Sequence, residues 1–232
     1  MKHKIRAFAA IMLMATMFFA IGCTPENDPN QGGVDVEYTY VDLGLPSGTL
    51  WATFNVGATT PEGYGDHFAW GETQAKTFYN WTNYRYCNGN YDQLNKYNYM
   101  SSYGCDGFTD TKSELEPGDD VATVVWGSEW CMPTYDQWKE LADHITGVWT
   151  TRNGKNGYLF TAENNKSLFL PAIGAFCNDD VEDEGTHGNY ASKTLSSRDS
   201  RYAWNFYFDA TFCGIHGANR GYGVVVRPVR AQ

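Results

Sequence analysis

The side chains best suited to covalent or metal chemistry are six cysteine thiols. They are Cys23, Cys87, Cys105, Cys131, Cys177 and Cys213. No two have the CxxC spacing of a zinc site, so we expect no metal bound through sulfur. Five cysteines follow Cys23, and an odd number in a secreted protein leaves at least one thiol free or paired outside the chain. We predict a Cys87–Cys105 disulfide, because both lie in a Tyr, Asn and Gly-rich stretch that a disulfide would stabilise.

Histidines and carboxylates could act as bases or metal ligands, but their spacing forms no catalytic motif. His67, His144, His187 and His216 are scattered, and the chain has no Gly-x-Ser-x-Gly elbow, HExxH pair or phosphate-binding loop. We therefore expect no catalytic residue and no cofactor. The segment 178–185 holds five carboxylates, which suit either a calcium ion or a solvated acidic loop.

The C-terminal segment favours binding over catalysis, because two regular stretches bracket an irregular one. Residues 202–209 alternate in polarity, which predicts a strand that buries the aromatic residues at 202, 204, 206 and 208. Residues 221–230 form the second regular stretch, and residues 210–220 have no period. Irregular exposed residues on a rigid support are typical of a recognition surface. The predicted ligand-binding residues are Ser197, Arg198, Asp199, Arg201, Asn205, Tyr207, Phe212, Ile215, His216, Asn219 and Tyr222.

The N-terminus predicts export and a lipid anchor. A basic start precedes an apolar run from Ala7 to Ile21, which is too short to span a membrane and is typical of a secretory signal. The site at Ala20–Cys23 resembles a bacterial lipobox, in which Cys23 is acylated; an ordinary cleavage site is the alternative. We therefore predict an outer-membrane lipoprotein at the cell surface. Its parts are a signal peptide at 1–22, a lipidated flexible tether at 23–37 and one domain at 38–232.

The charge of the mature chain narrows the choice of partners. Removal of residues 1–22 leaves 14 basic and 27 acidic side chains, a formal charge of −13. This balance argues against nucleic acid and against electrostatic adsorption to anionic lipid. The expected partners are therefore a protein or glycan ligand and a membrane, which the chain reaches through its lipid anchor.

The predicted elements are short strands and few helices. The clearest helix starts at Thr134, whose capping box includes Gln137, and three apolar residues from Trp138 onwards share one helical face. Residues 157–161 and 167–171 predict a hairpin around a turn. With 24 Gly and 16 Tyr in the chain, these elements predict an α+β fold with short antiparallel strands, few helices and much irregular loop.

Six blocks stand in order along the chain. They are Tyr40–Gly57, Gly65–Thr73, Tyr84–Gly89, Trp126–Thr134, Leu168–Ala172 and Val226–Arg230. Together they resemble the Fibrobacter succinogenes major paralogous domain, found in exported lipoproteins of gut Bacteroidales. The resemblance implies a C-type-lectin-like fold of the formylglycine-generating-enzyme type, without a common established activity. This chain departs from the family pattern at Ala191, where members have Trp, and at Cys131, where they have Arg.

The resemblance also supplies an alternative function. Formylglycine-generating relatives use a pair of C-terminal cysteines to activate oxygen at copper, whereas only Cys213 lies in that region here. We therefore predict a surface lipoprotein, with a role in adhesion, that binds its ligand without catalysis. An enzyme on the same fold and a structural component of the cell envelope remain the alternatives.

The C-terminus further resembles the variable proteins of diversity-generating retroelements, which end in a Gly-aromatic-Gly and Arg-Pro-Val pattern, here at 221–223 and 227–229. In those systems template adenines are randomised, so AAC codons do not become Lys, Glu, Gln or Met. Those four types number 24 within residues 24–193 and none within 194–231, where an equal frequency predicts about five. Short strands and turns also disfavour these residues, so both explanations stay open.

Overall fold

The computed structural model describes residues 38–230, which belong to one compact unit. The signal peptide, the lipidation site Cys23 and the tether predicted above lie outside the described residues. Strands are β1 (Tyr40–Asp42), β2 (Leu50–Ala52), β3 (Gly147–Arg152), β4 (Lys155–Thr161), β5 (Ser167–Pro171), β6 (Ala175–Cys177), β7 (Asp180–Glu182), β8 (Gly188–Leu195), β9 (Tyr202–Phe208), β10 (Cys213–Asn219) and β11 (Val229–Arg230). Helices are η1 (Ser101–Tyr103), η2 (Cys105–Gly107), η3 (Pro117–Asp119), α1 (Val121–Trp126) and α2 (Tyr135–His144).

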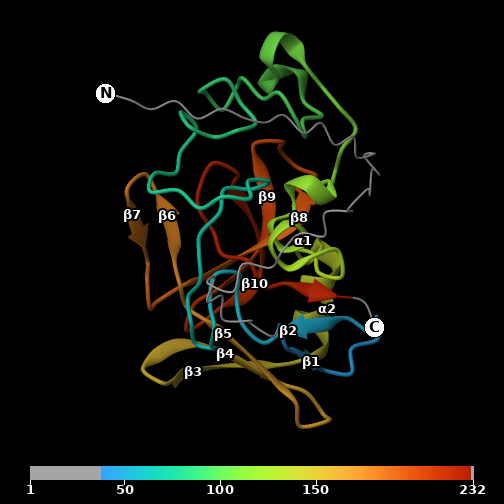
Figure 1. Ribbon diagram of the computed structural model, residues 1–232, viewed down its shortest axis with the longest axis vertical. Coiled ribbons are helices and arrows are strands. Elements are labelled where there is room, and N and C mark those ends of the chain that lie inside the picture. The colour runs from blue at the N-terminus through green and yellow to red at the C-terminus, as the bar shows by residue number, and fades with distance from the viewer. Residues whose placement is uncertain (1–37, 231–232) are drawn as a thin grey trace, which may run out of the picture. The chain divides into compact units, whose positions relative to one another are not determined.

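Short antiparallel strands dominate and helices are few (Figure 1), which confirms the predicted α+β class. The strands form sheets ordered β1-β2-β11, β10-β9-β8 and β3-β4-β5, with β6 and β7 as a separate pair. In the first sheet Val229 lies opposite Trp51, so the last described strand pairs with one of the first. The predicted hairpin is confirmed as β4 and β5, with Gly157 opposite Pro171.

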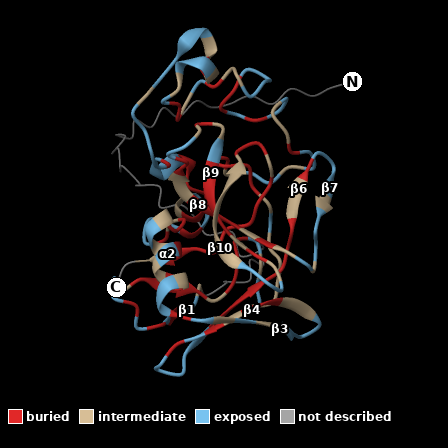
Figure 2. Cartoon of the chain, turned by 180° about the vertical axis from the view of Figure 1, so that it is seen from behind, coloured by how far each residue is buried: buried red, intermediate tan, exposed pale blue. Residues whose placement is uncertain are grey.

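Helix α2 covers one face of the β10-β9-β8 sheet. Its predicted capping box is confirmed: the Thr134 hydroxyl accepts from the Gln137 N–H at 3.1 Å, and the Gln137 side chain accepts from the Thr134 N–H at 2.9 Å. Trp138 is fully buried and stacks on Phe206 of β9, with ring centroids 4.7 Å apart and 1° between the planes. The buried residues of α2 thus face the sheet and its exposed residues face solvent (Figure 2).

Strand β9 departs from the predicted alternation, because it is the middle strand and both of its faces are covered. Tyr202 is 38% exposed rather than buried, whereas Asn205 is 2% exposed. Helix α2 covers one face, and a hydrophobic cluster that includes Ala203 of β9 and Ala191 and Leu195 of β8 covers the other. The predicted strand is confirmed, and Trp204, Phe206 and Phe208 are buried as predicted. The prediction was wrong for Tyr202, which is exposed, and for Asn205, which is buried.

The segment 210–220 is more regular than the sequence indicates. Most of it forms β10, which pairs with β9 over its full length. Its last residue, Arg220, is fully buried and donates to the carbonyl oxygens of Tyr97 and Ser200, both at 2.8 Å, and of Lys96 at 3.0 Å. Arg220 is therefore a structural residue that ties the C-terminal segment to the loop around residue 97.

The predicted Cys87–Cys105 disulfide is not formed, since all five cysteines in the described part of the chain are free. The buried Cys87 thiol donates to the carbonyl oxygen of Trp81 at 3.1 Å, whereas the Cys105 sulfur accepts from Asn88 at 3.0 Å. Backbone bridges from Leu94 to Cys87 and to Gly104 connect this loop instead. The prediction was wrong because hydrogen bonds supply the cross-links that a disulfide was expected to provide.

Candidate binding surfaces

Two depressions lie at the β10-β9-β8 sheet. The first, which we call the β10 hollow, has a volume of about 340 Å³ and is lined by Ala175, Cys177, Glu182, Asn189, Tyr202, Tyr207, His216, Gly217, Ala218, Asn219, Tyr222 and Val224. The second, the α2 groove, has a volume of about 710 Å³ and is lined by Tyr99, Thr111, Lys112, Ser113, Glu114, Thr134, Tyr135, Asp136, Thr194, Leu195, Ser196, Ser197, Arg198 and Trp204. Both volumes lie in the range of small-ligand sites.

Strand register places the polar and aromatic centre of the β10 hollow. Tyr207 of β9 lies opposite Gly214 of β10 and Asn189 of β8. Because Gly214 has no side chain, the Tyr207 ring is free to meet its diagonal neighbour His216, with ring centroids 4.8 Å apart in an edge-to-face arrangement. Successive strand residues point to opposite faces, so Tyr207 and Phe206, which packs on α2, lie on opposite sides of the sheet.

The chemistry of the β10 hollow suits hydrogen bonding more than proton transfer. Burial lowers the pKa of His216, so its ring is neutral at pH 7. Its Nε2 lies 3.3 Å from Oδ1 of Asn189, which positions the ring to donate through that nitrogen. Burial, and then the neighbouring Glu182, raise the pKa of the Cys177 thiol to about 12. A protonated thiol is a poor nucleophile.

Only part of the predicted binding surface gathers at the β10 hollow. Tyr207, His216, Asn219 and Tyr222 line it. Phe212 stands at its edge, 51% exposed and with its ring centroid 6.1 Å from that of Tyr207. These five residues come from β9, β10 and the segments that follow each of them, as the sequence predicts.

The remaining predicted residues lie elsewhere. Asn205 is buried between Ala191 and His216 in the sheet, so it offers no exposed contact, which corrects that assignment. Ile215 packs partly buried against the hydrophobic core beneath α2. Arg201 forms an ion pair of 2.6 Å with Asp199.

The predicted residues from 197 to 201 lie outside the β10 hollow. The guanidinium of Arg201 also lies 4.0 Å from the ring centroid of Tyr103, so the Asp199–Arg201 pair cross-links two loops. Ser197 and Arg198 line the α2 groove and not the β10 hollow. The predicted residues therefore divide among the hollow, the groove and structural positions.

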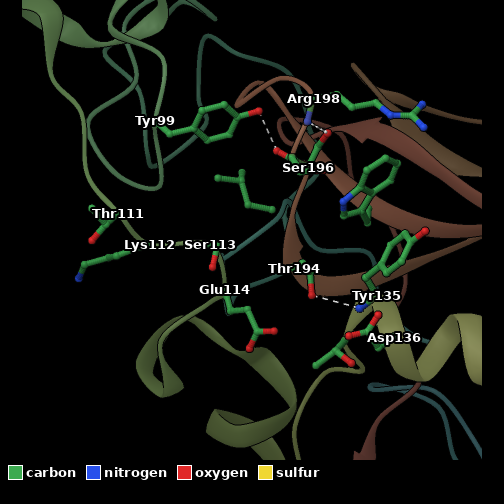
Figure 3. Close-up of a pocket in the computed structure, with 14 residues that line it drawn as sticks. Tyr99, Thr111, Lys112, Ser113, Glu114, Tyr135, Asp136, Thr194, Ser196 and Arg198 are labelled. Atoms are coloured by element: carbon green, nitrogen blue, oxygen red, sulfur yellow. Dashed lines mark hydrogen bonds between the residues drawn. The ribbon is translucent and has the colours of Figure 1, made fainter.

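The α2 groove is formed by segments far apart in the sequence (Figure 3). Tyr99 projects from a loop and donates to the carbonyl oxygen of Ser196 at 3.0 Å. Tyr135 and Asp136 come from the first turn of α2, and Glu114 comes from a segment that bridges to Thr194 of β8. Of the residues that line this groove, the sequence prediction included only Ser197 and Arg198. The capping box could have located Tyr135, but no periodic signal marks the positions of Tyr99 and Glu114.

The described residues form neither a metal-binding cluster nor a membrane-spanning helix. No three His, Cys, Asp or Glu side chains among them converge into a metal-binding group, and the acidic segment 178–185 forms no such cluster. Burial raises the pKa of the Cys213 thiol to about 12. Within residues 38–230 no helix has the length and apolar character needed to cross a membrane.

No protein-family model, curated protein or solved structure matches the chain. The resemblance to the major paralogous domain therefore rests on the six sequence blocks alone.

Proposed function

We propose that this chain is a lipid-anchored protein of the Gram-negative outer membrane, whose C-type-lectin-like domain binds a protein or glycan ligand at the cell surface without catalysis. The β10 hollow is the observation that carries the proposal. It combines the rings of Tyr202, Tyr207 and Tyr222 with polar groups on His216 and Asn219. Rigid aromatic side chains beside adaptable polar ones are the combination found in recognition surfaces.

The support of the hollow also suits a binding role. Tyr207 and His216 project from paired strands of one sheet, so their spacing is set by the backbone. Tyr222 is held by a turn in which its N–H donates to the carbonyl oxygen of Asn219 at 3.2 Å. A preorganised surface of this kind loses little conformational entropy on binding.

The enzyme alternative receives less support from the same region. A copper site of the formylglycine-generating type would need a pair of C-terminal cysteines, and Cys213 is the only cysteine in residues 178–232. Burial also raises the pKa of its thiol, which disfavours Cys213 as a nucleophile. Cys177 lies at the β10 hollow, but the carboxylate of Glu182 beside it also favours the protonated thiol. Both thiols therefore lack the lowered pKa that a reactive cysteine requires.

A binding screen tests the proposal directly. The mature chain carrying Cys23→Ser would be applied to arrays of glycans and of extracellular proteins. We expect at least one ligand whose Kd rises about tenfold or more on Tyr207→Ala or Tyr222→Ala, since central aromatic contacts dominate binding energy. Tyr40→Ala is the matched control, because Tyr40 is 50% exposed on β1 and does not line the hollow.

Two results would contradict this function. One is the absence of any ligand on either array. The other is a ligand whose affinity is unchanged in both tyrosine variants while their thermal midpoints stay close to that of the parent protein. A large fall in thermal midpoint would place the two rings among the structural residues and remove the reason for assigning them to a binding surface.

A further inference from the structure

The α2 groove and the β10 hollow are separate depressions. Trp204 of β9 lines the groove, and its ring centroid is 5.3 Å from that of Tyr135 at the start of α2. Tyr207, three residues along the same strand, lines the hollow. The two depressions share no lining residue, so a ligand in one leaves the side chains of the other free.

Hydroxyl groups dominate the polar lining of the α2 groove. Six serine or threonine residues contribute to it, and three of them already accept a backbone N–H. Thr194 accepts from Tyr135 at 3.1 Å, Thr134 accepts from Gln137 at 3.1 Å, and Ser196 accepts from Arg198 at 3.2 Å. A hydroxyl that accepts from the backbone keeps its own proton to donate. These three groups are therefore preset donors with fixed positions.

Aromatic rings provide the apolar part of the groove. Tyr99 is 42% exposed, and its hydroxyl donates to the backbone, which fixes the position of the ring. The rings of Tyr135 and Trp204 pack against each other, and both residues line the groove. Rings of this kind stack on flat apolar faces of a ligand, while their polar tips remain available for hydrogen bonds.

The charges that line the groove balance one another, because two cations meet two carboxylates. The cations are already engaged: Lys112 pairs with Glu116, and the guanidinium of Arg198 lies 5.3 Å from the ring centroid of Trp204. The carboxylates of Glu114 and Asp136 also line the groove (Figure 3), and Glu114 forms an ion pair of 3.5 Å with Nζ of Lys193. Carboxylate oxygens have several acceptor sites, so both groups can accept hydrogen bonds from hydroxyl groups of a ligand. This pattern disfavours phosphates and other anions.

We propose that the α2 groove is a second binding site, specific for a neutral oligosaccharide and independent of the β10 hollow. A sugar chain offers apolar ring faces to the aromatic side chains and hydroxyls to the preset donors and to the two carboxylates. A lipid would leave the hydroxyl lining without partners, and buried polar groups without partners are costly. The volume of about 710 Å³ accommodates several linked sugar rings. This site goes beyond the function proposed for the β10 hollow.

Calorimetric titration with neutral hexasaccharides of glucose, mannose, xylose and galactose tests the site. The protein is the mature chain with Cys23→Ser, alone and with Tyr135→Ala or Asp136→Asn. We expect at least one hexasaccharide to bind, with a Kd that rises tenfold or more in both variants. Asp136→Asn changes one exposed side chain, so it keeps the test valid if Tyr135→Ala lowers stability.

Tyr207→Ala is the matched control for Tyr135→Ala, because it also removes a tyrosine ring, but from the β10 hollow and not from the α2 groove. Unchanged hexasaccharide affinity in Tyr207→Ala, with loss in the groove variants, supports a second site even if the hollow binds nothing. Three results would overturn the proposal. They are no binding by any of the four hexasaccharides, binding that survives both groove substitutions, and binding that is lost only in Tyr207→Ala.

Discussion

Arg220 shows how a single side chain can sit in an irregular sequence and still belong to the core. Its guanidinium is fully buried, lies 4.8 Å from the ring centroid of Trp70, and pairs with no carboxylate within the described part of the chain. Neutral acceptors surround it instead, including the Tyr84 hydroxyl at 3.0 Å. A buried charge is retained only where hydrogen bonds replace its hydration, and here several do so.

We therefore expect Arg220→Met to lower the free energy of unfolding by at least ~2 kcal/mol. Each carbonyl left without a donor costs roughly 1–3 kcal/mol, and relief of the buried charge offsets part of that loss. Urea unfolding of the parent and variant proteins measures the difference. Arg198→Met is the control, since a surface change of this kind is expected to stay within ~0.5 kcal/mol. Equal stability of the two variants would show that Arg220 is not structural.

His67 is a buried histidine whose pKa is lowered. Its ring packs edge-to-face on Phe176, with centroids 5.7 Å apart, and its Nε2 is buried without a hydrogen-bond partner among the described residues. Burial lowers the pKa of His67 from 6.5 to about 4. Between these two pH values the unfolded chain binds a proton at His67 and the folded chain does not, so acid favours unfolding.

Stability should consequently fall as the pH drops from about 6.5 towards 4, by on the order of 2 kcal/mol from His67 alone. The lowered pKa of His216 acts in the same direction. The test compares urea unfolding at pH 7 and pH 4.5 for the parent chain and for His67→Phe, which should lose less stability in acid. His144→Gln alters an exposed histidine and should keep the full dependence. The same acid loss in His67→Phe would contradict the assignment.

At the scale of elements, α2 links stability to the α2 groove. The Thr134 side chain satisfies an N–H of the first turn, and that turn carries Tyr135 and Asp136. We expect Thr134→Ala to lower the free energy of unfolding by about 1 kcal/mol, the usual effect of losing an N-cap. Thr134→Ser retains the hydroxyl and should keep most of the stability. Denaturation of the three proteins side by side decides the matter, and equal values for Ala and Ser would exclude a capping role.

Elements with a local signal could be predicted from the sequence, whereas contacts between distant segments could not. The capping box and one apolar face predict α2, because both lie within residues 134–145. The burial of Asn205 depends on the hydrophobic cluster that contains its neighbours Ala191 and Ala203, and nothing near Asn205 in the sequence indicates it. Most of the α2 groove could not be predicted for the same reason, because only the fold brings Tyr99 and Tyr135 to one groove.

At the scale of the whole molecule, the C-terminal segment joins parts of the described chain that are remote in sequence. Val229 pairs with Trp51 of β2 and also bridges to Cys131. The buried Arg227 donates to the Asn55 side chain at 2.7 Å, and burial lowers the pKa of Arg227 to about 10. A segment with so many structural contacts tolerates variation only at the positions that these contacts leave exposed.

This constraint sharpens the hypothesis that the C-terminus is actively diversified. If it is, the genes of related isolates should differ mainly at codons for residues exposed around the β10 hollow, such as Tyr207, Phe212 and His216, and at positions matching template adenines. Arg220 and Phe206 should stay unchanged, because both are fully buried. Sequencing the gene and its flanking DNA in many isolates measures this, and a nearby repeat with a reverse transcriptase gene would identify the source. Substitutions spread evenly from residue 38 to 230, or frequent at the buried positions, would contradict diversification and favour an ordinary paralogue with one fixed ligand.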